Sequence, residues 1–190
     1  MLPEIFIIRH PETINNKEKI IEDPMGGDLS EYGKSQIHDA VKNLLSLEIS
    51  KVYSSDSARC KELAEAFSNE SEISINYDSM LREVNSGDWI GMKKIEVKKL
   101  IAQNKKPRHG EDLDQLMQRA KVILNKLIQE KGRILLITHG CLSKMIIGAT
   151  MNMNAYEADE KVSIKNCQII KLDLKNLELK QIPLIQKRKN

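Results

Sequence analysis

Two short apolar runs, each followed closely by a histidine, constrain the fold of this chain more than any other feature. Residues 5–8 precede Arg9-His10, and residues 134–137 precede Thr138-His139. Short uninterrupted apolar runs of this kind are typical of strands buried on both faces of a parallel sheet. The carboxyl ends of such strands meet at one edge, where ligands bind. The sequence therefore predicts that His10 and His139 face one site.

A third segment is expected to reach the same edge. Residues 51–54 read as a strand, and Arg59 falls in the first turn of the helix predicted to follow. The free N–H groups and the positive dipole end of a helix N-terminus favour anions, and a guanidinium offers a planar fork of donors that matches phosphate oxygens. Together with Arg9, these residues predict a phosphate pocket.

The remaining pattern alternates between strands and helices, which predicts an α/β three-layer sandwich with a mainly parallel central sheet and helices on both faces. In the clearest helix apolar residues recur with the helical period, and Asp112 with Gln115 forms a capping box at its start. The expected strands are 4–8, 51–54, 73–77 and 133–138, with a C-terminal hairpin of 162–173 and 177–183. The expected helices are 31–46, 57–68, 92–102, 113–130 and 141–150.

Length and composition agree with one enzyme domain. A chain of 190 residues that is 41% hydrophobic and 30% charged can bury a sizeable core. We expect a single domain over 1–190, with a short cap-like segment at about 84–110. Its three cysteines, Cys60, Cys141 and Cys167, are scattered, which favours neither a disulfide framework nor a zinc site.

Charge and hydropathy bear on partners and location. The net charge is only +3, aromatic residues make up 4%, and the basic tail at 187–189 is short, so we expect no nucleic-acid partner. The first four residues lack a basic region and the apolar stretch after them is short, so we expect no membrane segment and a cytoplasmic location. The sequence leaves a homodimer open.

Six short segments, met in order along the chain, resemble the motifs of the histidine phosphatase superfamily, which includes cofactor-dependent phosphoglycerate mutase. They run nearly from end to end, and six in the family's order make coincidence a poor explanation. The segments are Arg9–Thr13 with Asn16; Leu29-Ser30 with Gly33 and Gln36; 52–55 with Arg59 and Ala64; Leu81–Glu83 with Gly87, Trp89 and Gly91; Gly110-Glu111; and Thr138–Gly140.

The chain departs from the family pattern at four places without losing the predicted catalytic set. Pro11 stands where glycine is usual, and proline has no N–H to offer a phosphate. The other departures are Leu63 for threonine, Ile90 for glutamate and Asp112 for serine.

The chemistry of the nucleophile follows from the residue types. A neutral imidazole is nucleophilic near neutral pH, so His10 can attack phosphorus and carry the group as a phosphohistidine. Its other ring nitrogen must keep a proton, and we expect it to donate to a backbone carbonyl near Glu12 or Thr13. Arg9, Arg59 and a protonated His139 would neutralise the phosphoryl oxygens during transfer. This chemistry needs no metal and no cofactor.

The resemblance also assigns a proton donor and further binding groups. It places the family's general acid at Glu83, which otherwise reads as a solvated carboxylate. For the phosphate we expect contacts from Asn16, Gly140 and the backbone N–H of Cys141, whose thiol reads as a small core group. Glu111 is a second carboxylate that would orient a histidine.

Other residues have structural interpretations. His38 and His109 read as structural histidines and Trp89 as a packing residue near the site, while Arg59 taken alone would close a surface ion pair with Glu62 or Glu65. The basic stretch 93–108 reads first as a solvated helix face and second as a grip on another anionic group of the substrate.

The segment between the acid and Gly110-Glu111 is short. In the family this part covers the pocket, so the resemblance favours the compact phosphatase branch that includes α-ribazole phosphatase. The leading expectation is a metal-independent phosphomonoesterase that acts on a small phosphorylated metabolite through a phosphohistidine. The alternatives are a mutase-type phosphoryl transfer and a catalytically silent binder of a phosphorylated ligand.

Overall fold

A computed structural model describes residues 2–172 and 174 of the chain, and its core is a five-stranded sheet in the order β3-β2-β4-β1-β5. The strands are β1 (Glu4–Arg9), β2 (Lys51–Ser54), β3 (Ile75–Tyr77), β4 (Arg133–Thr138) and β5 (Ile169–Lys171). The first four are parallel to one another, and β5 pairs antiparallel with β1. The predicted α/β sandwich with a mainly parallel sheet is confirmed.

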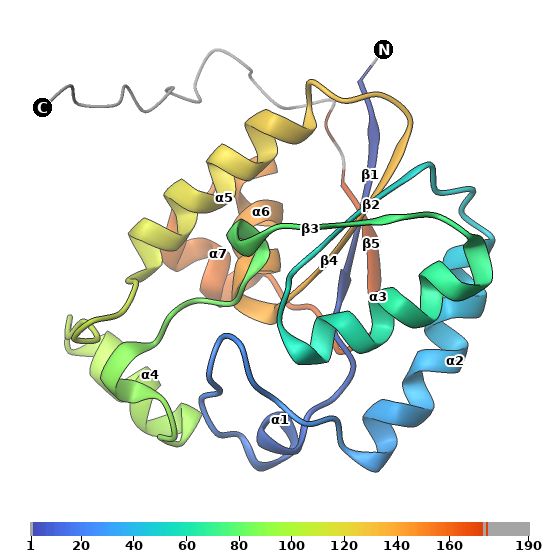
Figure 1. Ribbon diagram of the computed structural model, residues 1–190. Coiled ribbons are helices and arrows are strands. Elements are labelled where there is room, and N and C mark those ends of the chain that lie inside the picture. The colour runs from blue at the N-terminus through green and yellow to red at the C-terminus, as the bar shows by residue number, and fades with distance from the viewer. Residues whose placement is uncertain (1, 173, 175–190) are drawn as a thin grey trace, which may run out of the picture.

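Helices cover both faces of the sheet (Figure 1). On one face lie α2 (Glu31–Leu45) and α3 (Ala58–Ser71), and on the other lie α5 (Leu113–Leu127), α6 (Gly140–Thr150) and α7 (Ala155–Lys161). The central strands alternate between two core clusters: Ile5 and Ile7 of β1 pack toward α5 and α6, and Phe6 and Ile8 toward α2 and α3. The uninterrupted apolar runs in the sequence therefore reflect strands buried on both faces.

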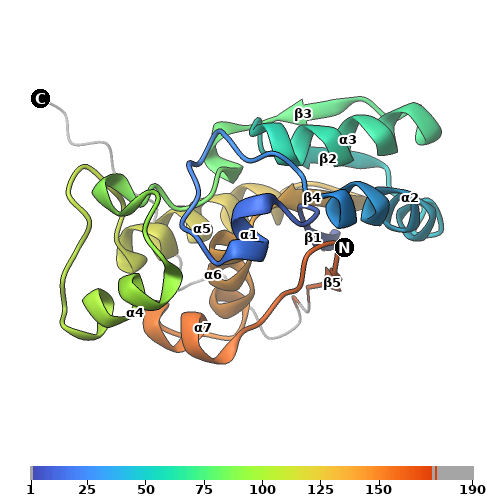
Figure 2. The ribbon, with the colours of Figure 1, turned by 90° about the horizontal axis from the view of Figure 1, so that it is seen from below.

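Two further helices lie at the end of the sheet where β1 finishes. These are α1 (Ile14–Glu18) and α4 (Lys94–Ala102), and Figure 2 looks onto this end of the molecule. The short 3-10 helices η1 (Ser79–Leu81) and η2 (Gly87–Trp89) connect β3 with α4. Segment 84–110 thus contains η2 and α4, and its role as a cap stays a prediction.

The element boundaries agree with the sequence in most places. The capping box at the start of α5 is present, because Gln115 N–H donates to Asp112 Oδ1 at 2.9 Å and Asp112 N–H donates to Gln115 Oε1 at 2.9 Å. The first arm of the expected C-terminal hairpin is shorter than predicted: residues 162–168 form no strand, and Ile169–Lys171 pairs with β1. The expected second arm, 177–183, lies outside the described residues.

Candidate active site

His10 stands immediately after β1 and is 2% exposed. Its Nδ1 lies 2.7 Å from the carbonyl oxygen of Pro11, which can only accept, so Nδ1 carries the proton and Nε2 keeps its lone pair. A backbone carbonyl was expected here, but near Glu12 or Thr13 rather than at Pro11. Burial, followed by the charges of Arg59 and Arg9, holds the pKa of His10 well below its usual range. The imidazole is therefore neutral.

The segment after His10 is held by the start of α2. Glu12 N–H donates to Gln36 Oε1 at 2.8 Å, and the hydroxyl of Ser30 donates to Glu12 Oε1 at 2.7 Å. A Cβ on Gly33 would lie 1.9 Å from the Glu12 carbonyl oxygen, so only glycine allows this approach. Ser30, Gly33 and Gln36 therefore serve to position the loop that carries His10.

His139, fully buried at the end of β4, lies with its ring centroid 5.1 Å from that of His10. Its Nδ1 accepts from Arg59 Nε at 3.2 Å, and its Nε2 lies 2.9 Å from Ser55 Oγ. Because a guanidinium keeps its protons, Nδ1 must be the acceptor of this hydrogen bond. The proton of the neutral imidazole therefore lies on Nε2. Burial, followed by the charge of Arg59, holds the pKa of His139 well below its usual range. That direction holds for the site without a phosphate, so a protonated His139 during transfer stays a prediction.

Arg59 belongs to the first turn of α3, as the sequence predicted, and its side chain is 1% exposed. Its Nη1 donates to the carbonyl of Asp23 at 3.0 Å and to that of Gly26. Its Nε also lies 3.5 Å from Glu22 Oε2. The loop between α1 and α2 therefore wraps around this guanidinium, and Arg59 forms a buried pair with Glu22 instead of a surface pair on its own helix.

Arg9 brings a second guanidinium to the site. Its Nη1 donates to the Ile164 carbonyl at 3.0 Å and its Nη2 to Asn16 Oδ1 at 3.2 Å. Its Nε is buried and has no hydrogen-bond partner among the described residues. A Cβ on Gly140 would lie 3.3 Å from Arg9 Cζ, so Gly140 leaves the guanidinium room to lie flat. Asn16 thus orients Arg9, and its direct contact with phosphate stays a prediction.

Glu83 lies against the N-terminus of α6. Its Oε2 accepts from Cys141 N–H at 3.0 Å, and its Oε1 accepts from Leu142 N–H at 3.2 Å and Val84 N–H at 3.0 Å. The backbone N–H of Cys141 was expected to face phosphate, and it instead binds this carboxylate. The Cys141 thiol packs at the edge of the core, where burial raises its pKa to about 12.

Glu111 does not orient a histidine, contrary to expectation. Its carboxylate accepts from Arg119 Nε at 2.9 Å and from Arg119 Nη2 at 2.6 Å. Arg119 Nη1 also donates to the carbonyls of Met80 and Arg82, each at 2.7 Å. Glu111 therefore supports the segment that carries Glu83 by fixing Arg119 against it.

A cavity of about 570 Å³ opens beside Arg9, Glu83 and Gly140. Apolar side chains from several elements form part of its wall: Ile21, Val84, Trp89, Val97, Ile101, Leu113 and Ile164. Lysines of the basic stretch also line it, namely Lys94, Lys98, Lys105 and Lys106. Lys93 and Lys99 do not line the cavity, and a contact between the other lysines and a substrate stays a prediction.

Several site residues gave no clear signal in the sequence. Ser55 and Asn166 contact the two histidines, Asn166 by donating to the His10 carbonyl at 2.9 Å, and Glu22 pairs with Arg59. Ser55 follows a predicted strand and falls in the family-like segment 52–55, but neither pattern pointed to a contact with His139. The other two lie in loops without periodicity.

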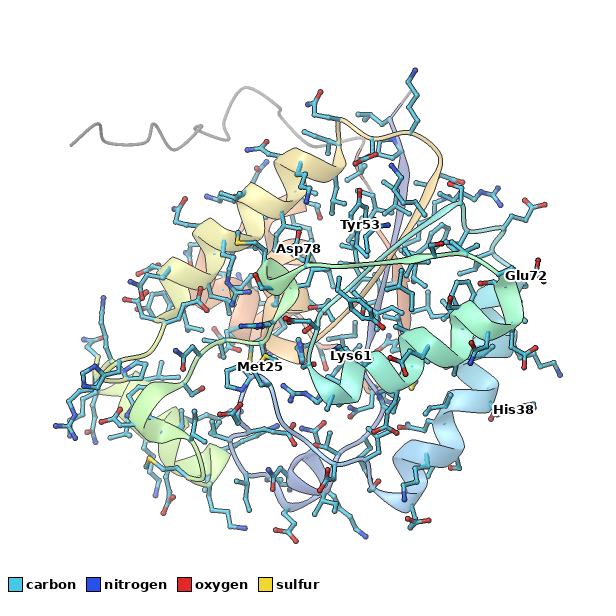
Figure 3. All side chains as sticks on the ribbon, viewed as in Figure 1. Met25, His38, Tyr53, Lys61, Glu72 and Asp78 are labelled. Atoms are coloured by element: carbon cyan, nitrogen blue, oxygen red, sulfur yellow. The ribbon has the colours of Figure 1, made fainter. Side chains whose placement is uncertain are left out.

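The two remaining histidines lie away from the site. His38 projects from the outer face of α2 (Figure 3), and His109 is exposed as well. Trp89 is buried at 8% exposure, as expected, and it also lines the cavity. Over the described residues, no group of three or more acidic, histidine or cysteine side chains is arranged to hold a metal ion. None of the helices in that part of the chain has the length and apolar character of a membrane span.

The comparisons with known proteins agree with this geometry. Residues 5–181 match the model of the histidine phosphatase superfamily, branch 1. The chain belongs to this superfamily. A member from Schizosaccharomyces pombe named "probable phosphatase" is 30% identical over 142 residues, which span 72% of this chain and 68% of the relative. The "probable phosphoglycerate mutase GpmB" of Erwinia tasmaniensis is 24% identical over 182 residues, which span 90% of this chain and 84% of the relative.

Solved structures of the superfamily share the fold. YhfR of Bacillus stearothermophilus superposes with a TM-score of 0.79 at 24% identity, covering 89% of this chain and 90% of that one. The α-ribazole phosphatase of Shigella flexneri superposes with a TM-score of 0.79 at 19% identity, covering 92% of each chain. The family match and the curated relatives, rather than these structures, support phosphoryl hydrolysis or transfer as the chemistry of the chain.

Proposed function

We propose that this histidine phosphatase is a phosphomonoesterase that works through a phosphohistidine on His10. The observation that carries the proposal is the contact of His10 Nδ1 with the Pro11 carbonyl at 2.7 Å, which leaves Nε2 free to attack, beside the buried Nε of Arg9, which has no partner among the described residues. A buried donor without an acceptor calls for an anionic ligand. The nucleophile and the anion donor thus stand on consecutive residues.

The reaction follows in two displacements. His10 Nε2 forms a bond to phosphorus while the bond to the ester oxygen breaks, and Glu83 gives that oxygen its proton. Water then attacks the phosphohistidine, Glu83 accepts its proton, and inorganic phosphate leaves. Arg9 and Arg59 stabilise the phosphoryl oxygens in both steps, and His139 Nε2–H, which donates to Ser55 Oγ in the free site, turns to those oxygens once the substrate is bound.

The cavity beside Glu83 supports a small metabolite with an anionic leaving group. Lys94 is half-buried in the wall of this cavity. Its ammonium group forms no hydrogen bond or ion pair with the described residues. Burial, followed by the charge of Arg9, lowers the pKa of Lys94, and an anion seated there would relieve both effects. Lys106 and Lys144 also line the cavity, but Asp112 and Asp159 already neutralise them.

A panel of phosphomonoesters assayed for phosphate release in EDTA tests the proposal. It should contain matched three-carbon esters with and without a carboxylate, and we expect release from both with a preference for the charged ester. Transfer of the phosphoryl group to another hydroxyl of the substrate, without release of phosphate, would favour a mutase. The relatives named probable phosphoglycerate mutase GpmB support this alternative. Binding without release or transfer would favour a silent binder.

A further inference from the structure

Glu22 is a buried carboxylate that the proposed reaction does not use. Its side chain is 7% exposed, and its Oε2 lies 3.5 Å from Nε of Arg59 and accepts from the Thr13 hydroxyl at 3.1 Å. Its Oε1 is buried and has no hydrogen-bond partner among the described residues. This carboxylate is therefore poorly compensated: it has one hydrogen bond and one neighbouring cation for two buried oxygens.

The cation beside Glu22 is the one that phosphate must use. The charged groups that face Glu22 come from three elements: Arg59 of α3, Lys94 of α4 and Glu83 after η1. Burial raises the pKa of Glu22, and Arg59 opposes that rise. A phosphate dianion placed on Arg59 would compete for this opposing charge and add like charges to the pocket.

Glu22 has little room to swing away from an incoming anion. A Cβ built on Gly27 would lie 2.6 Å from Glu22 Oε1 and 3.1 Å from Arg59 Cδ, so loop and guanidinium enclose the carboxylate. Gly27 also has φ of +107°, a conformation that favours glycine. Neutralisation by a proton is the response that leaves this packing in place.

We infer that Glu22 takes up a proton when a phosphoryl dianion binds Arg59, so that ligand affinity and proton binding are linked at this pair. The inference rests on the proposed phosphate pocket. It makes Glu22 a positioning residue: its carboxylate pairs with Arg59 before the dianion binds, and it becomes a neutral carboxylic acid once the dianion is bound. By linkage, affinity for a dianion falls with rising pH, by up to about tenfold per pH unit where one proton is taken up.

Calorimetric titration with sulfate tests the linkage without turnover. Sulfate stays a dianion between about pH 6 and pH 8, so any proton uptake belongs to the protein. Titration in buffers of different ionisation enthalpy gives the number of protons bound per sulfate. We expect wild-type protein to take up about one proton more than Glu22→Gln. We also expect the affinity of the variant to depend less on pH. Glu62→Gln, an exposed carboxyl on α3, is the matched control and should behave as wild type.

The outcomes separate this inference from the proposed function. Equal proton uptake by wild type and Glu22→Gln would overturn the inference and leave the phosphate pocket standing. His139 or His10 would then be the group that takes up the proton. If the wild type binds sulfate without taking up a proton, the inference is overturned, and no comparison with a variant is needed. A wild-type protein that does not bind sulfate at all would overturn the phosphate pocket and the inference together.

Discussion

Arg59 Nε donates to His139 Nδ1 at 3.2 Å, and this single bond fixes the tautomer of the histidine. Because a guanidinium keeps its protons, His139 must accept on Nδ1 and carry its own proton on Nε2. His10 has the opposite tautomer, with its proton on Nδ1 toward the Pro11 carbonyl. The two imidazoles therefore have different tasks: His10 offers a lone pair on Nε2, and His139 offers a donor.

Replacing His10 with alanine should abolish turnover and leave the fold intact, since His10 belongs to neither hydrophobic core cluster. After brief incubation with a labelled phosphomonoester, acid-labile and base-stable phosphate should appear on the wild-type chain only. Circular dichroism of both proteins controls for folding. Near-native hydrolysis by the alanine variant would rule out the phosphohistidine.

Replacing Arg59 with alanine should cost roughly 3 kcal/mol of transition-state stabilisation, the scale of one lost oxyanion donor. The measurement is kcat/KM for one substrate. Arg108→Ala is a suitable control because that exposed arginine pairs with Asp88 on the surface. Arg59→Lys should recover little, because an ammonium lacks the fork that contacts His139 and the loop carbonyls together.

The same pocket predicts how inhibitors and chelators act. Vanadate should inhibit, because it adopts the geometry of the transferring phosphoryl group between Arg9 and Arg59. EDTA should leave the rate unchanged, because the proposed charge stabilisation comes from side chains. An absolute requirement for added magnesium or zinc would contradict the proposed chemistry.

The sequence predicted the parallel strands and the convergence of Arg9, His10, Arg59 and His139 because both depend on local patterns. Runs such as 5–8 and 134–137 are long and apolar enough to indicate buried strands, and residues at the ends of parallel strands must converge. Helix α1 was missed because its five residues have no apolar periodicity. Helix α7 was missed although Asn154 and Glu157 form a recognisable capping box at its start.

The missed site residues depend on contacts between distant loops. Glu22 is buried only because residues 22–26 wrap around Arg59, which lies more than thirty positions later in the chain. The pairing of Ile169–Lys171 with β1 was not predicted for a related reason: alternating apolar residues indicate a strand but do not identify its partner. Expectations for Glu111 and Cys141 failed because their partners, Arg119 and Glu83, come from other elements.

The buried histidines should make the protein less stable as the pH falls below about 6.5, the ordinary histidine pKa. In the unfolded chain both imidazoles take up protons there, whereas the folded protein keeps them neutral, so acid favours unfolding. Each contributes about 1.4 kcal/mol per pH unit until its lowered folded-state pKa is reached. Urea unfolding between about pH 5.5 and pH 7 measures how the free energy of unfolding changes with pH. We expect this change to be reduced by about half in His139→Gln. His38→Gln, on the surface, should keep the wild-type slope.

Glu83→Gln keeps the size of the side chain, and its single amide oxygen can still accept backbone hydrogen bonds on one side, but it cannot donate a carboxyl proton to the leaving group. Hydrolysis of an alkyl ester such as a sugar phosphate should therefore fall sharply. p-Nitrophenyl phosphate leaves as a stabilised phenolate and needs less help, so the variant should retain relatively more activity on it. The comparison requires conditions in which phosphoryl transfer limits both rates, which a burst of p-nitrophenolate would exclude. Equal losses on the two esters would remove Glu83 from the role of general acid, and its three backbone hydrogen bonds to Val84, Cys141 and Leu142 would then mark it as an anchor of α6.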